Sequence, residues 1–341
     1  MVRRVLLPLH LDDRTPPPGA AIRDLHGLTM GTSWSVRLVD SAMPGRAGSA
    51  DLRQGLQQQL DLVVAQMSHW QADSDLGRFN RAAPGSWQQL PAAFGEVLDF
   101  ALQVSQASAG AYDPCAGALV NAWGFGAGNR HDQPGFRAPD AASVRQLLSQ
   151  DRRIEFDVAT RRVRQSGSVQ LDLSSVAKGY AVDRLARYLD SQGVEHYLVE
   201  VGGELRGAGC KSDGQPWWVM LEQVDDADAA LHPAQMMLAL HGLSVATSGD
   251  YRRFFHDGSV RYAHTIDPRS GMPINNQLAS VTVVHAQCMA ADAWSTALTV
   301  LGSEAGMVLA EQQGLAARFV RRDGQAYQEY LSSALLALLV D

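Results

Sequence analysis

The sequence predicts an α+β fold with mixed, mainly antiparallel sheets and packed helices. Strand-like and helix-like segments are interspersed, without the regular strand–helix alternation of a doubly wound parallel sheet. Hydrophobic residues make up 46% of the 341 residues and charged residues 19%, which is ordinary for a folded core and excludes a largely disordered chain. At roughly 150 residues per domain, this length allows one large domain or two domains that pack together.

Strands are predicted where apolar and polar residues alternate. Over residues 29–40, Trp34, Val36 and Leu38 alternate with serine and arginine side chains, which is typical of a half-buried strand. A hairpin is expected over residues 152–165 because the same alternation is interrupted by turn residues. Further strands are expected over residues 196–209, 216–224, 243–255, 261–268 and 278–286.

Helices are predicted where apolar residues recur at spacings of three and four. This pattern indicates helices over residues 51–70, 91–109 and 141–150, and one from Ser174–Ser175 to Gly193. Two more helices are expected in ADAWSTALTVLG, which contains Asp292, and in GMVLAEQQG. Residues 125–140 and 225–235 are expected to be loops, and residues 325–340 fit either a strand or a helix.

The N-terminal segment is expected to be a flexible tail over residues 1 to 25, containing the stiff run Pro16–Pro18. Its apolar run is too short for a secretory signal, and no lipobox-type cysteine follows it, so the chain is interpreted as cytoplasmic. The longest apolar stretch, LSSALLALLV, is about half of the ~20 residues that a membrane-spanning helix needs.

Charge and cysteine content exclude several classes of protein. The 29 basic and 36 acidic residues give a net charge of −7, which argues against binding nucleic acid or anionic lipid through a basic surface. Cys115, Cys210 and Cys288 lie far apart and form no CxxC motif, so neither a disulfide framework nor a structural zinc site is expected. No nucleotide-binding fingerprint of the G-x-G-x-x-G or G-x-x-x-x-G-K-[ST] type occurs at a strand end.

Two polar, glycine-containing stretches indicate a phosphate or planar ligand. Asp113 precedes a proline among small and aromatic residues, which fits either an Asx turn or a carboxylate held beside a planar ligand. After Asp172, a helix is expected to start with Lys178 and Gly179 in its first turn, and free N–H groups at a helix start suit a phosphate. The alternative is an ordinary serine-capped helix with a solvent-facing lysine.

Two further stretches indicate acid–base chemistry and a metal ion. His264 lies in a predicted strand before an Ile–Asp–Pro turn, and such a histidine is either structural or a proton acceptor. Asp292 and Thr296 are four residues apart on one helix face, and hard oxygen ligands of this kind suit Mg²⁺. Alone, Asp292 is also explained as an acidic residue that favours a helix N-terminus.

Together, these stretches resemble the ApbE family, whose members are FAD:protein FMN transferases. The resemblance covers about residues 28 to 335, and it favours one catalytic domain over residues 26–341 with a T-fold-like architecture. The motifs that carry it occur in the family's order; they are MGTSW, SHWQADSDLGRFN, YDPCAGALVNAWGFG, LDLSSVAKGYAVD, VEVGGELRGAG, TSGDYRRFF, HTIDPRSG and ADAWSTAL.

The resemblance implies an Mg²⁺-dependent transfer of FMN from FAD to a threonine or serine hydroxyl of an acceptor flavoprotein, with release of AMP. The acceptor would carry a D-x-x-[ST]-G-[AS]-T-type motif. Some relatives hydrolyse FAD to FMN and AMP, so an FAD pyrophosphatase and a non-catalytic FAD-binding protein remain alternatives. Many relatives are exported lipoproteins, which favours a periplasmic location, against the interpretation of the N-terminus. A monomer or a homodimer is expected.

The resemblance also assigns roles to particular residues of this chain. His264 and Asp267 would be catalytic, with His264 taking the proton of the incoming hydroxyl directly or through Asp267. Ser175, Asp292 and Thr296 would bind the metal ion. The residues that would bind FAD are Met30, Trp70, Ala111, Tyr112, Asp113, Asp172, Lys178 and Thr265.

Overall fold

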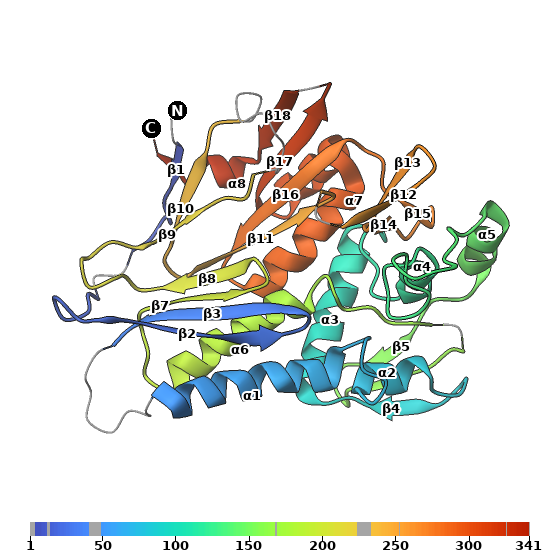
Figure 1. The fold of residues 1–341 in the computed structure, drawn as a ribbon, viewed down its shortest axis with the longest axis horizontal. Coiled ribbons are helices and arrows are strands. Elements are labelled where there is room, and N and C mark those ends of the chain that lie inside the picture. The colour runs from blue at the N-terminus through green and yellow to red at the C-terminus, as the bar shows by residue number, and fades with distance from the viewer. Residues whose placement is uncertain are drawn as a thin grey trace.

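An eight-stranded antiparallel sheet forms the centre of the protein (Figure 1). The computed structural model describes residues 4–11, 14–40, 49–167, 169–223, 233–251, 253–324 and 326–340. Every neighbouring pair in the sheet is antiparallel. In spatial order the strands are β18 (Ala326–Leu331), β17 (Ala316–Asp323), β16 (Leu278–His285), β11 (Leu243–Gly249), β8 (Glu204–Ala208), β7 (Tyr197–Val201), β3 (Thr32–Val39) and β2 (Ile22–Thr29).

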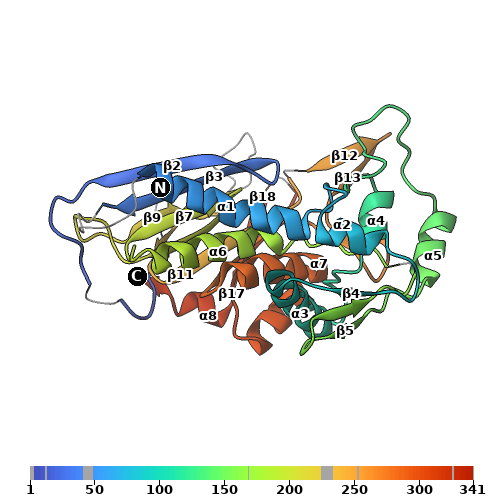
Figure 2. The same ribbon diagram turned by 90° about the horizontal axis from the view of Figure 1, so that it is seen from below.

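Three long helices cover one face of this sheet (Figure 2). They are α1 (Ser49–Met67), α6 (Ala177–Ser191) and α7 (Cys288–Gln312). In α1, the leucines at 52, 56 and 60 repeat every four residues, and all of them are buried in the main core. The predicted alternation in β3 is confirmed, because Trp34, Val36 and Leu38 face the same core.

A smaller four-stranded sheet packs against the opposite face. Its order is β19 (Leu339–Val340), β1 (Arg4–Leu6), β10 (Met236–Leu240) and β9 (Trp217–Met220), with β1 parallel to β10. A second apolar cluster lies between the sheets, with Leu6 and Trp217 from the small sheet and Val245 and Val284 from the large one. Arg4–Leu6 therefore differ from the flexible tail expected over residues 1 to 25, because main-chain pairing holds them between two strands.

The remaining elements cluster at the other end of the molecule, away from the chain termini (Figure 1). Only α8 (Ser333–Leu336) among these described elements lies elsewhere, because it directly precedes β19 of the smaller sheet. The sheet elements are β4 (Trp87–Gln89), β5 (Glu155–Asp157) and β6 (Arg162–Arg164) in one small sheet, hairpin β12 (Phe254–Asp257)–β13 (Val260–Ala263), and the pair β14 (Ile266–Asp267)–β15 (Met272–Pro273). The helices are α2 (Asp75–Asn80), α3 (Ala92–Ala107), α4 (Gly117–Ala122) and α5 (Ala141–Ser149).

The α+β, mainly antiparallel fold class is confirmed, and so is the hairpin over residues 152–165. The C-terminal stretch combines the two alternatives, because it contains strand β18, helix α8 and strand β19 in succession. The expected loop over residues 225–235 lies largely outside the described residues. Among the helices of the described chain, none combines the length and apolar character needed to cross a membrane.

Helix α7 spans the two helices that the sequence predicts near its start and end. Gly302 breaks it, with φ at 82° and ψ at 176°, a conformation that side chains with a Cβ rarely adopt. The first half, up to Gly302, carries Asp292 and Thr296 and packs against α6 and the sheet. The residues of α7 that line the pocket, Asp292, Thr296 and Val300, all lie before this break.

Candidate active site

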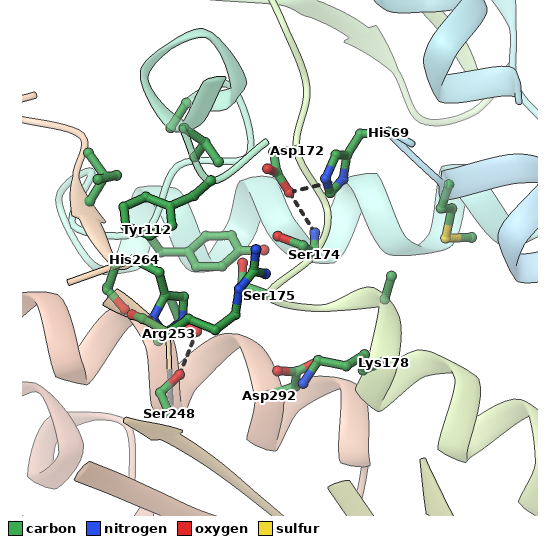
Figure 3. Close-up of a pocket in the computed structure, with 18 of the residues that line it drawn as sticks. His69, Tyr112, Asp172, Ser174, Ser175, Lys178, Ser248, Arg253, His264 and Asp292 are labelled. Atoms are coloured by element: carbon green, nitrogen blue, oxygen red, sulfur yellow. Dashed lines mark hydrogen bonds and ion pairs between the residues drawn. The ribbon is translucent and has the colours of Figure 1, made fainter. Parts of the chain in front are cut away.

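A pocket of about 400 Å³ opens between the large sheet's helices and the small elements at that end of the molecule. All four stretches singled out from the sequence contribute to its wall, although they are far apart in the chain (Figure 3). Of the thirteen predicted site residues, all except Asp267 line it. These twelve are Met30, Trp70, Ala111, Tyr112, Asp113, Asp172, Ser175, Lys178, His264, Thr265, Asp292 and Thr296.

Asp267 lies outside the pocket wall. Its carboxylate accepts hydrogen bonds from the backbone N–H and the side chain of Arg269, at 2.9 to 3.0 Å. Its carbonyl accepts the N–H of Gly271, so the residue closes the turn between β14 and β15. The side chain is bound to Arg269 and organises the turn that follows His264, and a proton relay through Asp267 stays a prediction.

Asp292 is held at the point where α6 and α7 come closest. Its Oδ2 accepts the backbone N–H of Gly179 at 2.9 Å. A Cβ at Gly179 would lie 2.3 Å from the carbonyl oxygen of Cys288, so only glycine permits this approach. Gly179 in the first turn of the helix thus has a structural reason: it brings a backbone N–H to the Asp292 carboxylate.

Helix α6 begins at Ala177, slightly later than the serine-capped start that the sequence predicts. Asp172 Oδ1 accepts the N–H of Ser174 at 2.8 Å, which forms a turn before the helix. The N-cap position is Val176, which provides no side-chain hydrogen bond. Ser174 and Ser175 therefore line the pocket instead of capping the helix.

Lys178 is part of a buried charged cluster with Glu204 and Asp292. Its ammonium group donates to Glu204 Oε1, and both Glu204 and Asp292 are less than 5% exposed. Burial alone would lower the pKa of Lys178, but the two carboxylates outweigh it and raise that pKa. Burial raises the pKa of Glu204 to about 7 and also raises that of Asp292, while Lys178 opposes both shifts.

Glu204 is a site residue that the residue-by-residue sequence reasoning does not assign. Its second oxygen, Oε2, is buried in the pocket wall and has no hydrogen-bond partner in the described part of the chain. The available signal was its place in the VEVGGELRGAG motif, where a glutamate follows two glycines at the start of a strand. Its role as the partner of Lys178 becomes visible only when β8 is placed beside α6.

His264 follows strand β13 and faces the pocket with one ring nitrogen available. Its Nδ1 lies 3.1 Å from the carbonyl oxygen of Arg253, which can only accept, so Nδ1 carries the proton and Nε2 has the free lone pair. Burial lowers the pKa of His264 to about 4, and the charge of Arg253 adds to this effect. The ring is therefore a neutral proton acceptor at neutral pH.

The segment from Ala111 to Asp113 forms the wall beside Ser175. Asp113 Oδ1 accepts the N–H of Cys115 at 2.8 Å, and Arg152 lies 3.6 Å from Oδ2. The Asx turn considered from the sequence is therefore present, and the same side chain lines the pocket. Burial raises the pKa of Asp113, with the Cys115 N–H opposing it. Tyr112 is buried, and burial raises the pKa of its hydroxyl well above the ordinary value.

Trp70 and Met30 add apolar surface to the pocket lining. Trp70 is 48% exposed and packs against His69, and the guanidinium group of Arg130 lies 5.6 Å from its ring centre. Met30 has a positive φ of 50° in the tight turn between β2 and β3, which places its side chain at the pocket. An exposed indole ring beside a thioether provides a stacking surface for a flat aromatic ligand.

The donor set around Asp292 fits Mg²⁺. The described residues contain no group of three or more His, Cys, Asp or Glu side chains arranged for a metal. Asp292 has one oxygen that does not bind Gly179, and Thr296 places its hydroxyl 2.9 Å from that of Ser248. Mg²⁺ typically takes one or two carboxylates and completes its shell with water and phosphate oxygens.

The fold and the pocket bring a histidine with a free ring nitrogen, a buried carboxylate and an exposed indole ring around one cavity, an arrangement typical of an enzyme. The ApbE family model matches residues 30–319, and the chain belongs to the ApbE family. It is 35% identical over 317 residues to the FAD:protein FMN transferase of Vibrio cholerae serotype O1, covering 92% of both chains. It is 33% identical over 336 residues to that of Klebsiella pneumoniae, covering 96% of this chain and 93% of the relative.

Solved structures agree with this membership. The apo form of the flavinyl transferase ApbE from Pseudomonas stutzeri is similar with a TM-score of 0.83 and 37% identity, over 94% of this chain and 97% of that one. The ApbE protein of Thermotoga maritima is similar with a TM-score of 0.81 and 25% identity, over 94% of this chain and 100% of that one. The family that the sequence motifs predict is therefore confirmed.

Proposed function

We propose that this protein transfers FMN from FAD to a threonine or serine hydroxyl of an acceptor protein and releases AMP, in the presence of Mg²⁺. The observation that carries this proposal is the pairing of His264 with Asp292 across one pocket. A neutral histidine with a free Nε2 supports removal of a hydroxyl proton, and a buried carboxylate with nearby hydroxyls supports binding of a metal with phosphate. The names of the family relatives support FAD as the donor and a protein as the acceptor.

The proposed reaction is one displacement at phosphorus. His264 Nε2 takes the proton of the acceptor hydroxyl, and the hydroxyl oxygen forms a bond to the FMN phosphorus. The bond from that phosphorus to the bridging oxygen breaks, and its electron pair leaves with AMP. His264 is suited to this step because the Arg253 carbonyl fixes its tautomer and its orientation.

The metal ion would be held by Asp292 and Thr296, with Ser175 from the segment just before α6. When bound, Mg²⁺ supplies positive charge to the phosphate oxygens and so lowers the cost of charge in the transition state. The hydrogen bond from Gly179 orients the Asp292 carboxylate toward this position. The cluster of Lys178 and Glu204 keeps this carboxylate beside a positive charge in a buried environment.

The flat rings of FAD would contact Trp70 and Met30, and the Ala111–Asp113 segment would hold the edge of a ring or a nucleotide. Asp172 would bind polar groups of the ligand, because its carboxylate lies in the pocket wall. Thr265, beside His264, is buried and would contribute to the wall near the reacting group. These contacts require a ligand with both a large aromatic system and a phosphate chain.

Mass spectrometry of an acceptor protein tests this function. The protein is incubated with FAD, Mg²⁺ and an acceptor that carries a D-x-x-[ST]-G-[AS]-T-type motif, with an acceptor lacking the final threonine as the control. The expected result is an acceptor mass increased by one FMN, with an equal amount of AMP. Release of FMN and AMP without acceptor would identify an FAD pyrophosphatase, and FAD binding without AMP release would identify a binding protein.

A further inference from the structure

The pocket has a shortage of uncommitted positive charge. Lys178 and Arg253 are the lysine and arginine side chains among its described lining residues, against the carboxylates of Asp113, Asp172, Glu204 and Asp292. The Lys178 ammonium group is already bound to Glu204 and lies in the field of Asp292. A ligand with a pyrophosphate therefore meets a wall in which the lysine is neutralised by carboxylates of the protein itself.

Arg253 differs from the arginines around it. Arg261 and Arg322 both bind Asp250, and Arg269 binds Asp267. In the portion of the chain that the structure describes, no carboxylate forms an ion pair with Arg253, although its side chain lines the pocket. Figure 3 shows this side chain pointing into the pocket from the same wall as His264.

The backbone fixes Arg253 relative to His264. The Arg253 carbonyl accepts both the backbone N–H and the ring Nδ1–H of His264, each at 3.1 Å. The two residues flank the β12–β13 hairpin, because Arg253 precedes β12 and His264 follows β13. A hydroxyl that gives its proton to His264 must attack a phosphorus close to both side chains. Within the proposed reaction that phosphorus belongs to FMN, because AMP is the leaving group.

We propose that Arg253 binds the phosphoryl group that is transferred, at the FMN end of the FAD pyrophosphate. This assignment rests on the proposed function. An arginine beside the attacked phosphorus neutralises charge on the phosphoryl oxygens and presents several N–H donors in a fixed plane. Binding of the phosphate also offsets the positive charge that faces His264, so the histidine becomes a stronger base when the substrate is in place.

Binding of three flavins to the protein without Mg²⁺ tests this role. Riboflavin lacks the phosphate, FMN has the transferred phosphate, and FAD has both phosphates. In Arg253→Gln the affinities for FMN and FAD should fall by about 10- to 100-fold, the range expected for one charge-assisted contact, while the affinity for riboflavin stays unchanged. Quenching of flavin fluorescence measures all three, and Arg253→Lys should lose less than Arg253→Gln because it keeps the charge.

Arg145→Gln is the matched control, because Arg145 is an exposed arginine on α5 outside the pocket lining. Equal losses for FMN and riboflavin in Arg253→Gln would overturn the assignment, as would a wild-type protein that binds FMN no more tightly than riboflavin. If the wild type fails to modify any acceptor, the proposed function fails, whereas the difference between FMN and riboflavin still decides the role of Arg253.

The pH dependence of kcat/KM for FAD gives a second readout that a merely structural role would not change. Loss of the Arg253 charge raises the pKa of His264 in the free enzyme, so the acid limb should move to higher pH in Arg253→Gln. Arg253→Lys should leave the acid limb near its wild-type position. An acid limb at the wild-type position in both variants would contradict the placement of this charge beside His264.

Discussion

Asp292 and His264 face the same pocket from walls that are built in opposite ways. Asp292 is 4% exposed, on a long helix that packs against α6 and the central sheet, and its carboxylate binds a backbone N–H of α6. His264 lies at the end of a two-stranded hairpin and is held by one carbonyl of a neighbouring loop residue. The wall that carries Asp292 is part of the protein core, whereas the wall that carries His264 is built on a small hairpin outside the large sheet.

This difference indicates how the site divides its tasks. In the buried wall, Lys178 binds one oxygen of Glu204 and the Gly179 N–H binds Asp292, while Glu204 Oε2 has no hydrogen-bond partner among the described residues. The outer wall leaves His264 Nε2 and the Arg253 side chain available to incoming groups. A change in the buried wall should therefore affect both folding and activity, and a change in the outer wall should affect activity with little loss of stability.

The largest effect is expected for Asp292→Ala. Transfer activity should fall by about 10³-fold or more, because the carboxylate of the metal site is lost, and the melting temperature should fall because the Gly179 N–H and Lys178 lose a buried partner. Activity titrated against Mg²⁺, together with thermal unfolding, measures both effects. Asp292→Asn keeps a hydrogen-bond acceptor for Gly179 and should preserve the fold while losing activity. Full activity in either variant would remove Asp292 from the metal site.

His264→Ala should lose transfer activity by about 10²- to 10⁴-fold, the range for removal of a general base. FAD affinity and the midpoint of urea unfolding should remain near wild type, because the side chain forms a single hydrogen bond, to the Arg253 carbonyl. Single-turnover transfer and flavin fluorescence separate the two quantities. Retained transfer in this variant would show that another group accepts the proton.

Gly179→Ala should destabilise the protein by about 1 to 3 kcal/mol, because the new Cβ would overlap the Cys288 carbonyl and the Asp292 Cβ. The overlap should also push α6 away from α7 and so weaken the binding of Mg²⁺ that activity requires. Gly128→Ala is the control, since no atom lies within 4 Å of its added Cβ. Urea unfolding of the two variants measures the difference, and equal stability would mean that the helices tolerate a wider spacing.

The smallest effect is expected from the titration of His264. Its pKa is about 4 in the folded protein and near 6.5 in an unfolded chain. The folded state therefore binds fewer protons between these values. The contribution of His264 to the free energy of unfolding is complete above pH 6.5 and is lost as the pH falls toward 4. His264→Gln should remove about 1 to 2 kcal/mol of this acid destabilisation. Unfolding curves at pH 7 and pH 4.5 compare the two proteins, and parallel pH dependence would show that His264 is solvated.

Particular residues show how much the sequence could predict. The alternation in β3 and the leucine repeat of α1 identify their buried faces, because one periodicity determines one face of a strand or helix. The sequence places Lys178 and Gly179 in the first turn of a helix, but the reason for a glycine there lies on α7, more than a hundred residues away. Asp267 had the right neighbours in the motif, but its bidentate contact with Arg269 becomes visible only in the folded turn between β14 and β15.

Other features of the fold and the site could not be predicted, because they depend on pairing between segments that are distant in the sequence. Glu204 is polar at the start of an ordinary strand, and its burial beside Lys178 follows only from the order of strands in the sheet. The strand character of Arg4–Leu6 likewise depends on the gap between β10 and β19. Local propensity is weak for three residues, so the tertiary partner decides.

The small sheet also affects the order in which the protein can fold. Strand β1 pairs with β19 through Val5 and Val340, so residues at opposite ends of the described chain are neighbours in space. Contacts of such high sequence separation carry a large loop-closure cost, and during synthesis the first strand has no partner on that edge until the last one has emerged. The helices and strands that carry the pocket lie between these ends, so the pocket can assemble while the small sheet is still incomplete.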